Sequence, residues 1–473
     1  MDNPVILIGG AAAFFVAAFI LIQSKKTIFW TAFILVFFPI DYLNRYFVNI
    51  PTIGRWLPLL TMVGFAMLIF LVMTDRKAQF PRSMVWIYRL FLGVSILSMI
   101  ANHTAVGALV VAQRGFIMVF AFMTMLKAVY YIYDKHDLFT FVVWGGLASS
   151  FCAFFQRFFF VMVQGRSADM VAGLFPVDGI YLHFQLVVIA IVLSYWLQGR
   201  RVNRYMSNDV VLVILMMSLA LGNNKAGFLF LGLIIAFVAS IAGVKTVMRN
   251  FGKLLAGFAM VGLVGMIFSA MFNKTYEESD EEDFSEAIQR PEYIQRYLFG
   301  GKLKHQKFAP SGQLLRGASV EFAYLLIVED PITSFIGMGP GSTQHSNMPG
   351  AMGWLEEKYP GYTIGRVPTS MYLAETGWIG LLLQILLLFS IYHWKPKHAW
   401  QDRPEFIMSR KAFVVATLFF YIYENLYFEP VFALLIGVMV YPNVKPKVEE
   451  EEEEGGEAED TLPPQEEITF NRI

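Results

Sequence analysis

The chain has 473 residues, of which 56% are hydrophobic and only 16% charged, and its formal net charge is zero. With a mean hydropathy of +0.53, it carries more apolar surface than one soluble core could bury, so the composition argues against a soluble enzyme and predicts a polytopic membrane protein. Its single cysteine, Cys152, excludes an internal disulfide and any metal site built from several cysteines.

Apolar runs divide the chain into about thirteen candidate membrane spans. They lie near residues 4–23, 27–43, 56–73, 84–100, 106–126, 138–163, 180–198, 209–222, 226–243, 254–272, 368–394, 412–427 and 429–442. The shortest are only just long enough for roughly 30 Å of hydrocarbon and could be broken helices or a re-entrant hairpin. The predicted fold is therefore an all-α polytopic transmembrane bundle of about 12 to 13 spans.

The distribution of positive charge predicts the topology of this bundle. About 20 Lys and Arg residues collect in alternate loops, whereas the loops between them hold about 4, namely Arg45, Arg55, Arg166 and Lys225. Because cytoplasmic loops are rich in Lys and Arg, we expect the N-terminus to lie outside and the C-terminus in the cytoplasm.

Four regions follow from the spans and the charge pattern. They are the N-terminal part of the bundle (1–272), one large extracytoplasmic loop (273–367), the C-terminal transmembrane helices (368–442) and an acidic cytoplasmic tail (443–473). The tail contains six consecutive Glu residues and too few apolar ones to form a core, so it is predicted to be disordered.

Two arginines fall inside predicted spans. Arg114 and Arg157 both lie near the outer ends of their spans. A guanidinium at such a depth costs on the order of 2.5 to 3.5 kcal/mol, so each is expected to face a polar cavity or an anion. Snorkelling to the interface explains either arginine taken alone.

The large loop holds further polar candidates. His305 and His345 have no second ligand at metal-binding spacing, so no metal site is predicted. The glycine-rich stretch 337–342 could present backbone N–H groups to a phosphate, and a simple chain reversal explains it equally well. The run 314–328 has apolar residues at helical spacing, which predicts a helix on the membrane face.

Four short motifs occur in order between about residues 100 and 440. They are Arg166 followed by Ala172-Gly173-Leu174-Phe175-Pro176; Gly222-Asn223-Asn224-Lys225-Ala226; Arg316, a helical run, Asp330-Pro331 and Gly337-Met338-Gly339-Pro340-Gly341-Ser342; and Leu373-Ala374-Glu375-Thr376-Gly377-Trp378-Ile379-Gly380-Leu381. As a set they resemble the O-antigen ligase and Wzy-type polysaccharide polymerase superfamily of membrane glycosyltransferases. The ligase branch carries a His-Asn pair where this chain has Arg366 and Val367, which favours the polymerase branch.

The resemblance implies a GT-C-like membrane enzyme that needs no cofactor, metal or nucleotide sugar. Its donor would be an undecaprenyl-diphosphate-linked oligosaccharide, whose repeat units it would polymerise into O-antigen, capsule or exopolysaccharide at the outer face of the bacterial cytoplasmic (inner) membrane. Membrane lipid, a chain-length regulator and a flippase are the expected partners, and nucleic acid is not. Two alternatives stay open: an O-antigen ligase acting on a lipid acceptor, and a flippase or other transporter of the lipid-linked oligosaccharide.

The resemblance, together with the positions of the charged residues, suggests roles for particular residues. The expected catalytic residues are Arg316, Glu321 and Glu375. Cations that would bind the diphosphate or the glycan are Arg114, Arg157, Arg166, Lys225, Arg290 and Arg366. Positive groups placed in advance suit this chemistry, because the leaving diphosphate gains negative charge as the anomeric bond breaks. Glu321, Glu375, Asp178 and His345 are the candidates for the base that receives the proton of the acceptor hydroxyl.

Overall fold

The computed structural model describes residues 81–128, 133–163, 171–175, 177–221, 225–243, 245–252, 255, 259, 316–344, 353–360, 362–395, 403–426 and 429–441. Within these ranges the chain is all-helical and contains no strand. The predicted spans near 4–23, 27–43 and 56–73, most of the span near 254–272, and the acidic tail lie outside the described residues.

Most of the predicted spans inside the described ranges are confirmed as helices within a few residues. They are α5 (Arg82–Ala101), α6 (Val106–Ala128), α7 (Lys135–Gln156) continued by the π-helical turn η2 (Arg157–Val163), α8 (Asp178–Leu197), α9 (Asn208–Leu221), α10 (Lys225–Ala242), α17 (Pro368–Tyr392) and α19 (Pro430–Val440). Four helices are long and apolar enough to cross a membrane, namely α5, Lys135–Phe159, α8 and α17. By length and composition these four support a membrane protein.

One predicted span was wrong at both ends. The span expected near 412–427 is the helix α18 (Pro404–Phe420), so Arg410 lies buried in a helix and not in a cytoplasmic loop. Proline at the first helical position gives up no hydrogen bond and favours this early start. An ion pair between Arg200 and Glu405, 2.7 Å apart, links this first turn to the segment after α8; the Glu405 side chain is buried, whereas that of Arg200 is 49% exposed.

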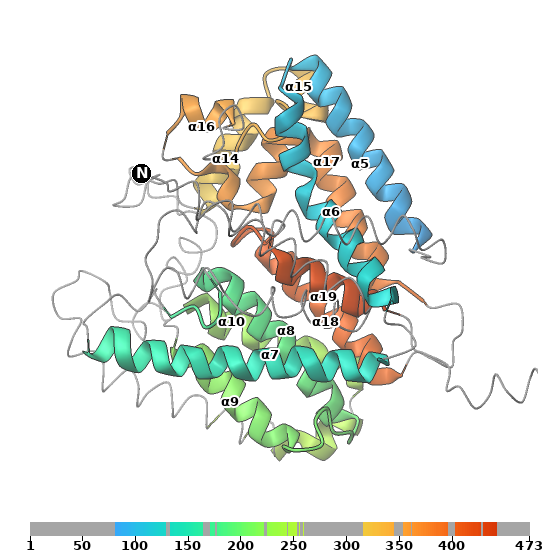
Figure 1. Ribbon diagram of the computed structural model, residues 1–473, viewed down its shortest axis with the longest axis vertical. Helices are drawn as coiled ribbons and strands as arrows, with labels where there is room; N and C mark the ends of the chain where they lie inside the picture. Colours follow the sequence, from blue (N-terminus) through green and yellow to red (C-terminus); the bar gives the residue numbers. More distant parts are fainter. Residues whose placement is uncertain are drawn as a thin grey trace, which may run out of the picture.

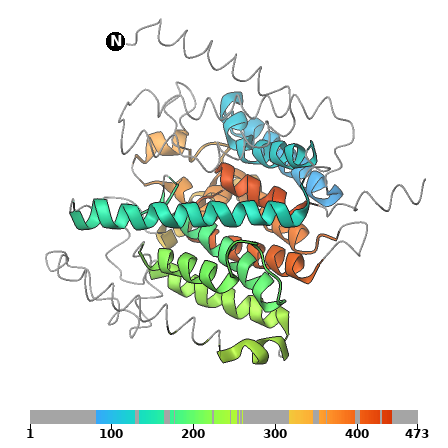
Figure 2. The same ribbon diagram turned by 60° about the horizontal axis from the view of Figure 1, so that its bottom comes forward.

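The helices form two groups with α18 and α19 between them (Figure 1). On one side α5 packs against α17; on the other, α8 packs against α9 and α10. Helix α18 joins the groups by contacting both α8 and α17, and α19 packs along α6. Figure 2 shows α7 running across the bundle on one face. Because α8 is buried along almost its whole length, it forms the centre of the described core.

The described part of the large loop is folded against this bundle. It contains α14 (Arg316–Ile327), α15 (Pro331–Ile336), α16 (Trp354–Lys358) and the 3-10 turn η5 (Ile364–Arg366). Helix α14 confirms the helical run predicted within 314–328. Both α14 and α15 pack against α17, so this loop is built into the same structure as the helices that follow it.

Helix α17 is interrupted by Gly377, whose backbone has φ 65° and ψ −165°. The break brings the helix against the glycine-rich loop: Met338 N donates to Ala374 O at 2.7 Å, and Gly339 N donates to Glu375 O at 3.2 Å. A Cβ on Gly377 would lie 2.5 Å from the carbonyl carbon of Phe335. This position therefore requires glycine. The Glu-Thr-Gly part of the sequence motif is therefore where the span and the loop meet.

The topology can be tested at two exposed positions, one on α16 in the large loop and one in the segment that follows α8. In a Cys152→Ser background, we expect Glu357→Cys on α16 to react with a membrane-impermeant maleimide on intact cells. Tyr205→Cys, in the segment after α8, should react only after the cells are permeabilised. The reverse pattern would place the loop in the cytoplasm and contradict the predicted orientation.

Candidate anion-binding site

Two arginines predicted from the sequence meet at one carboxylate. Arg316 is the first residue of α14, Arg366 is the last of η5, and Glu424 lies in the turn between α18 and α19. Glu424 Oε2 is 3.3 Å from Arg366 Nε and 3.6 Å from Arg316 Nη2. We call Arg316, Arg366 and Glu424 the charge cluster.

Backbone hydrogen bonds between two distant segments hold the charge cluster in place. Asn425 N donates to Arg366 O at 2.7 Å, and Asn425 Nδ2 donates to Gly365 O at 3.0 Å. Thr369 donates to Tyr421 O both through its amide, at 3.1 Å, and through its hydroxyl, at 2.7 Å. The positions of Arg366 and Glu424 are therefore determined by the pairing of these segments.

The guanidinium of Arg316 is held by more than its ion pair. Its Nε donates to Tyr423 O at 2.7 Å, and its centre lies 4.0 Å from the centroid of the Tyr423 ring. The planar guanidinium can stack and donate at the same time, which an ammonium group cannot do. The side chain of Arg316 is 18% exposed and that of Arg366 is 37% exposed, so both can be reached from solvent.

Glu424 experiences opposing electrostatic effects. The turn that carries it lies outside the four helices of membrane-spanning length. Burial raises the pKa of its carboxyl, the guanidinium groups of Arg366 and Arg316 act to lower this pKa, and the nearby Asp178 raises it further. Burial is the largest of these effects, so the net direction is upward. Glu424 thus holds a proton more readily than a carboxylate in water.

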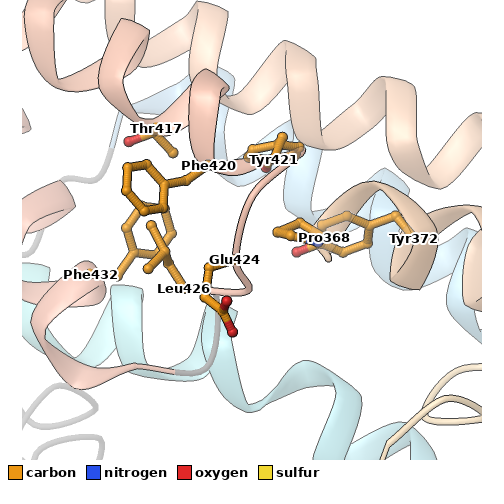
Figure 3. A pocket seen from close by; sticks show the side chains of 8 residues that line it. All are labelled: Pro368, Tyr372, Thr417, Phe420, Tyr421, Glu424, Leu426 and Phe432. Carbon is orange, nitrogen blue, oxygen red and sulfur yellow. The ribbon is translucent and has the colours of Figure 1, made fainter. Parts of the chain in front are cut away.

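A small pocket adjoins the charge cluster (Figure 3). It is lined by Pro368, Tyr372, Thr417, Phe420, Tyr421, Glu424, Leu426 and Phe432. Its free space is about that of one water molecule, so it cannot hold a sugar ring as it stands. Any glycan or diphosphate would have to approach the two arginines from their exposed side.

Glu375 belongs to a different environment. Its carboxylate is buried and accepts hydrogen bonds from Gly341 N at 2.9 Å, Thr343 N at 3.3 Å and Thr343 Oγ1 at 2.7 Å. The glycine-rich loop does present N–H groups to an anion, but that anion is the protein's own carboxylate. In this arrangement Glu375 fastens the loop to α17.

The other predicted residues are more scattered. Glu321 lies on an exposed part of α14. Arg157 is buried at the start of η2, next to Gln156, whose Oε1 accepts from the amides of Ala172 and Gly173 in the first sequence motif. Arg114 lies in α6 and Lys225 begins α10, but their side chains are outside the described part of the structure. Arg166, Arg290, His305 and His345 lie outside the described residues as well.

The sequence interpretation did not identify Glu424 as a functional residue. A signal was available, because an ionisable side chain within an apolar run is expensive and tends to mark a site. Its partners could not be identified in that way, since Arg366 lies 58 residues away along the chain.

Among the described residues, no group of three or more His, Cys, Asp or Glu side chains could hold a metal ion. No family model matches the chain, and no curated protein matches its sequence. The functional assignment must therefore depend on the chemistry of the charge cluster and on the motifs that led to it.

Proposed function

We propose that this protein is a GT-C-like membrane glycosyltransferase that polymerises oligosaccharide repeat units linked to undecaprenyl diphosphate, at the outer face of the bacterial cytoplasmic membrane. The observation that carries this proposal is the convergence of Arg316 and Arg366 on the carboxylate of Glu424. Both arginines come from the large loop; the sequence led us to expect Arg316 as a catalytic residue and Arg366 as a residue that binds the diphosphate or the glycan.

The chemistry of the reaction makes use of such a pair. The acceptor hydroxyl oxygen attacks the anomeric carbon of the donor sugar, and the bond from that carbon to the phosphate oxygen breaks. The electron pair remains on the lipid diphosphate, where two guanidinium groups held in advance would stabilise it more strongly in the transition state than in the ground state. Arginine suits this role because its fork of N–H donors matches phosphate oxygens.

Asp178 is our candidate for the group that receives the proton of the hydroxyl. It begins α8, and the next residue, Gly179, packs so closely on Glu424 that a Cβ there would lie 2.6 Å from Glu424 Cγ. By contrast, Glu375 already accepts hydrogen bonds from the glycine-rich loop, so we assign it a structural role in support of the site.

The proposal can be tested with the purified protein in detergent. The donor would be a lipid-diphosphate oligosaccharide, with excess EDTA and no nucleotide sugar. We expect the glycan to lengthen, as seen by gel electrophoresis. Mass spectrometry should show one lipid diphosphate released for each glycosidic bond formed. A single transfer to a lipid acceptor would instead identify a ligase. Movement of the intact lipid across liposomes without any bond formation would identify a transporter and contradict the proposal.

A further inference from the structure

The carboxylate of Glu424 occupies the position that an anionic ligand of the two arginines would need. Both guanidinium groups pair with this one carboxylate in the described structure. An anion bound by both would lie within a few ångströms of Glu424. Two negative charges at that separation repel strongly where water is partly excluded, and the side chain of Glu424 is only 12% exposed.

We propose that Glu424 is a resident counter-ion of this site, and that it takes up one proton when a diphosphate headgroup binds to Arg316 and Arg366. The inference deepens the proposed function and rests on it. In the free protein the carboxylate neutralises part of the positive charge of the two arginines. In the bound state the diphosphate takes over that role, and the neutral carboxyl group of Glu424 remains beside it without repulsion.

The surroundings of Glu424 favour this exchange. The charged or titratable groups that face it are Arg316 from α14, Arg366 from η5, Asp178 from α8, Tyr372 from α17, and Tyr421 and Tyr423 from its own turn. The two positive and two negative groups give the site no net charge. Neutralising one carboxylate leaves a net positive charge, which favours the binding of an anion. Glu424 is the carboxylate that pairs with both arginines, and burial already raises its pKa, so it is the group placed to take up the proton.

The sign of the pH dependence follows from this coupling. Diphosphate binding raises the pKa of Glu424 above its value in the free protein. Affinity is therefore greatest below the free-state pKa, falls by up to about tenfold per pH unit between the two pKa values, and is level above the bound-state value. At low pH Glu424 is neutral and does not oppose the anion, whereas at high pH its negative charge weakens the binding.

Calorimetric titration of the full-length protein in nanodiscs with inorganic pyrophosphate tests the inference. Measurements in two buffers of different ionisation enthalpy report the number of protons taken up. We expect the wild type to take up about one proton more than Glu424→Gln, whose amide oxygen can still accept from Arg366. At pH 8 the variant should bind about tenfold more tightly than the wild type, and this advantage should shrink at lower pH. Protonation of pyrophosphate itself is common to both proteins and cancels in the comparison.

Two controls make the result specific. Glu357→Gln removes an exposed carboxylate on α16 and should keep the wild-type proton number. Sulfate, which does not titrate between pH 5 and 8, should cause proton uptake by the wild type, so the inference remains testable if Glu424→Gln fails to fold. Farnesyl diphosphate in the same nanodiscs should bind more tightly than pyrophosphate if the ligand is a lipid headgroup.

Equal proton numbers for the wild type and Glu424→Gln, with both binding pyrophosphate, would overturn the inference. The polymerisation assay separates this result from failure of the proposed function, since glycan lengthening by the wild type would leave the enzyme assignment standing. If the wild type bound neither pyrophosphate nor sulfate at any pH from 5 to 8, the anion site would be wrong and the inference would fall with it.

Discussion

Arg316→Gln should slow glycan polymerisation by roughly ten- to a hundredfold. In the proposed reaction, the substitution removes a charge-assisted contact to the leaving diphosphate, and such a contact contributes about 1.5 to 3 kcal/mol. Arg316→Lys should restore little of the loss, because an ammonium group cannot donate to Tyr423 O and stack on the Tyr423 ring at the same time. The measurement is the rate of glycan lengthening by purified protein at a saturating concentration of the lipid-linked donor.

Arg366 provides a comparison within the same charge cluster. Its side chain is more exposed than that of Arg316, so we expect Arg366→Gln to fall at the lower end of this range. If both arginines hold one diphosphate, the double variant should lose less than the product of the single effects. Arg204→Gln removes an exposed guanidinium at the other end of α8 and serves as the control, with a rate near wild type. Normal rates in both Arg316→Gln and Arg366→Gln, with normal expression, would dismiss the cluster as the diphosphate site.

Glu375→Gln should produce the largest loss of stability among the substitutions considered. The carboxylate accepts two backbone N–H bonds and one hydroxyl bond while almost fully buried. An amide in its place turns one acceptor oxygen into an NH₂ group that faces these donors. We expect a cost of about 2 to 4 kcal/mol, seen as a clear fall in the midpoint of thermal unfolding measured by size-exclusion chromatography after heating.

This variant also separates a structural role from a catalytic one. If Glu375 only holds the glycine-rich loop against α17, the folded fraction of the Glu375→Gln variant should retain activity. Glu375→Asp should recover part of the stability that Glu375→Gln loses. Glu357→Gln, which changes an exposed carboxylate in the same way, should leave the unfolding midpoint unchanged. Loss of all activity at an unchanged midpoint would instead make Glu375 the base of the reaction.

Local sequence was sufficient for the helices of the described bundle. Long apolar runs predicted α5, α6, α7, α8 and α17 within a few residues, because partition into lipid depends on the length and composition of each segment alone. Helix α18 shows where that reasoning stops. The stretch that begins at Pro404 carries Glu405 and Arg410 and reads as a polar loop, but the partner of Glu405 is Arg200, which lies 205 residues away.

The same distinction applies to the site. The motifs in the sequence singled out Arg316, Arg366 and Glu375 as functional candidates, but only the tertiary structure showed that the first two share a carboxylate and that the third binds the glycine-rich loop. Arg316 and its carbonyl partner at Tyr423 are 107 residues apart, and Gly341 and Glu375 are 34 apart. These pairs form because separate segments hydrogen-bond to one another across the fold, and the hydropathy of either segment carries no information about its partner.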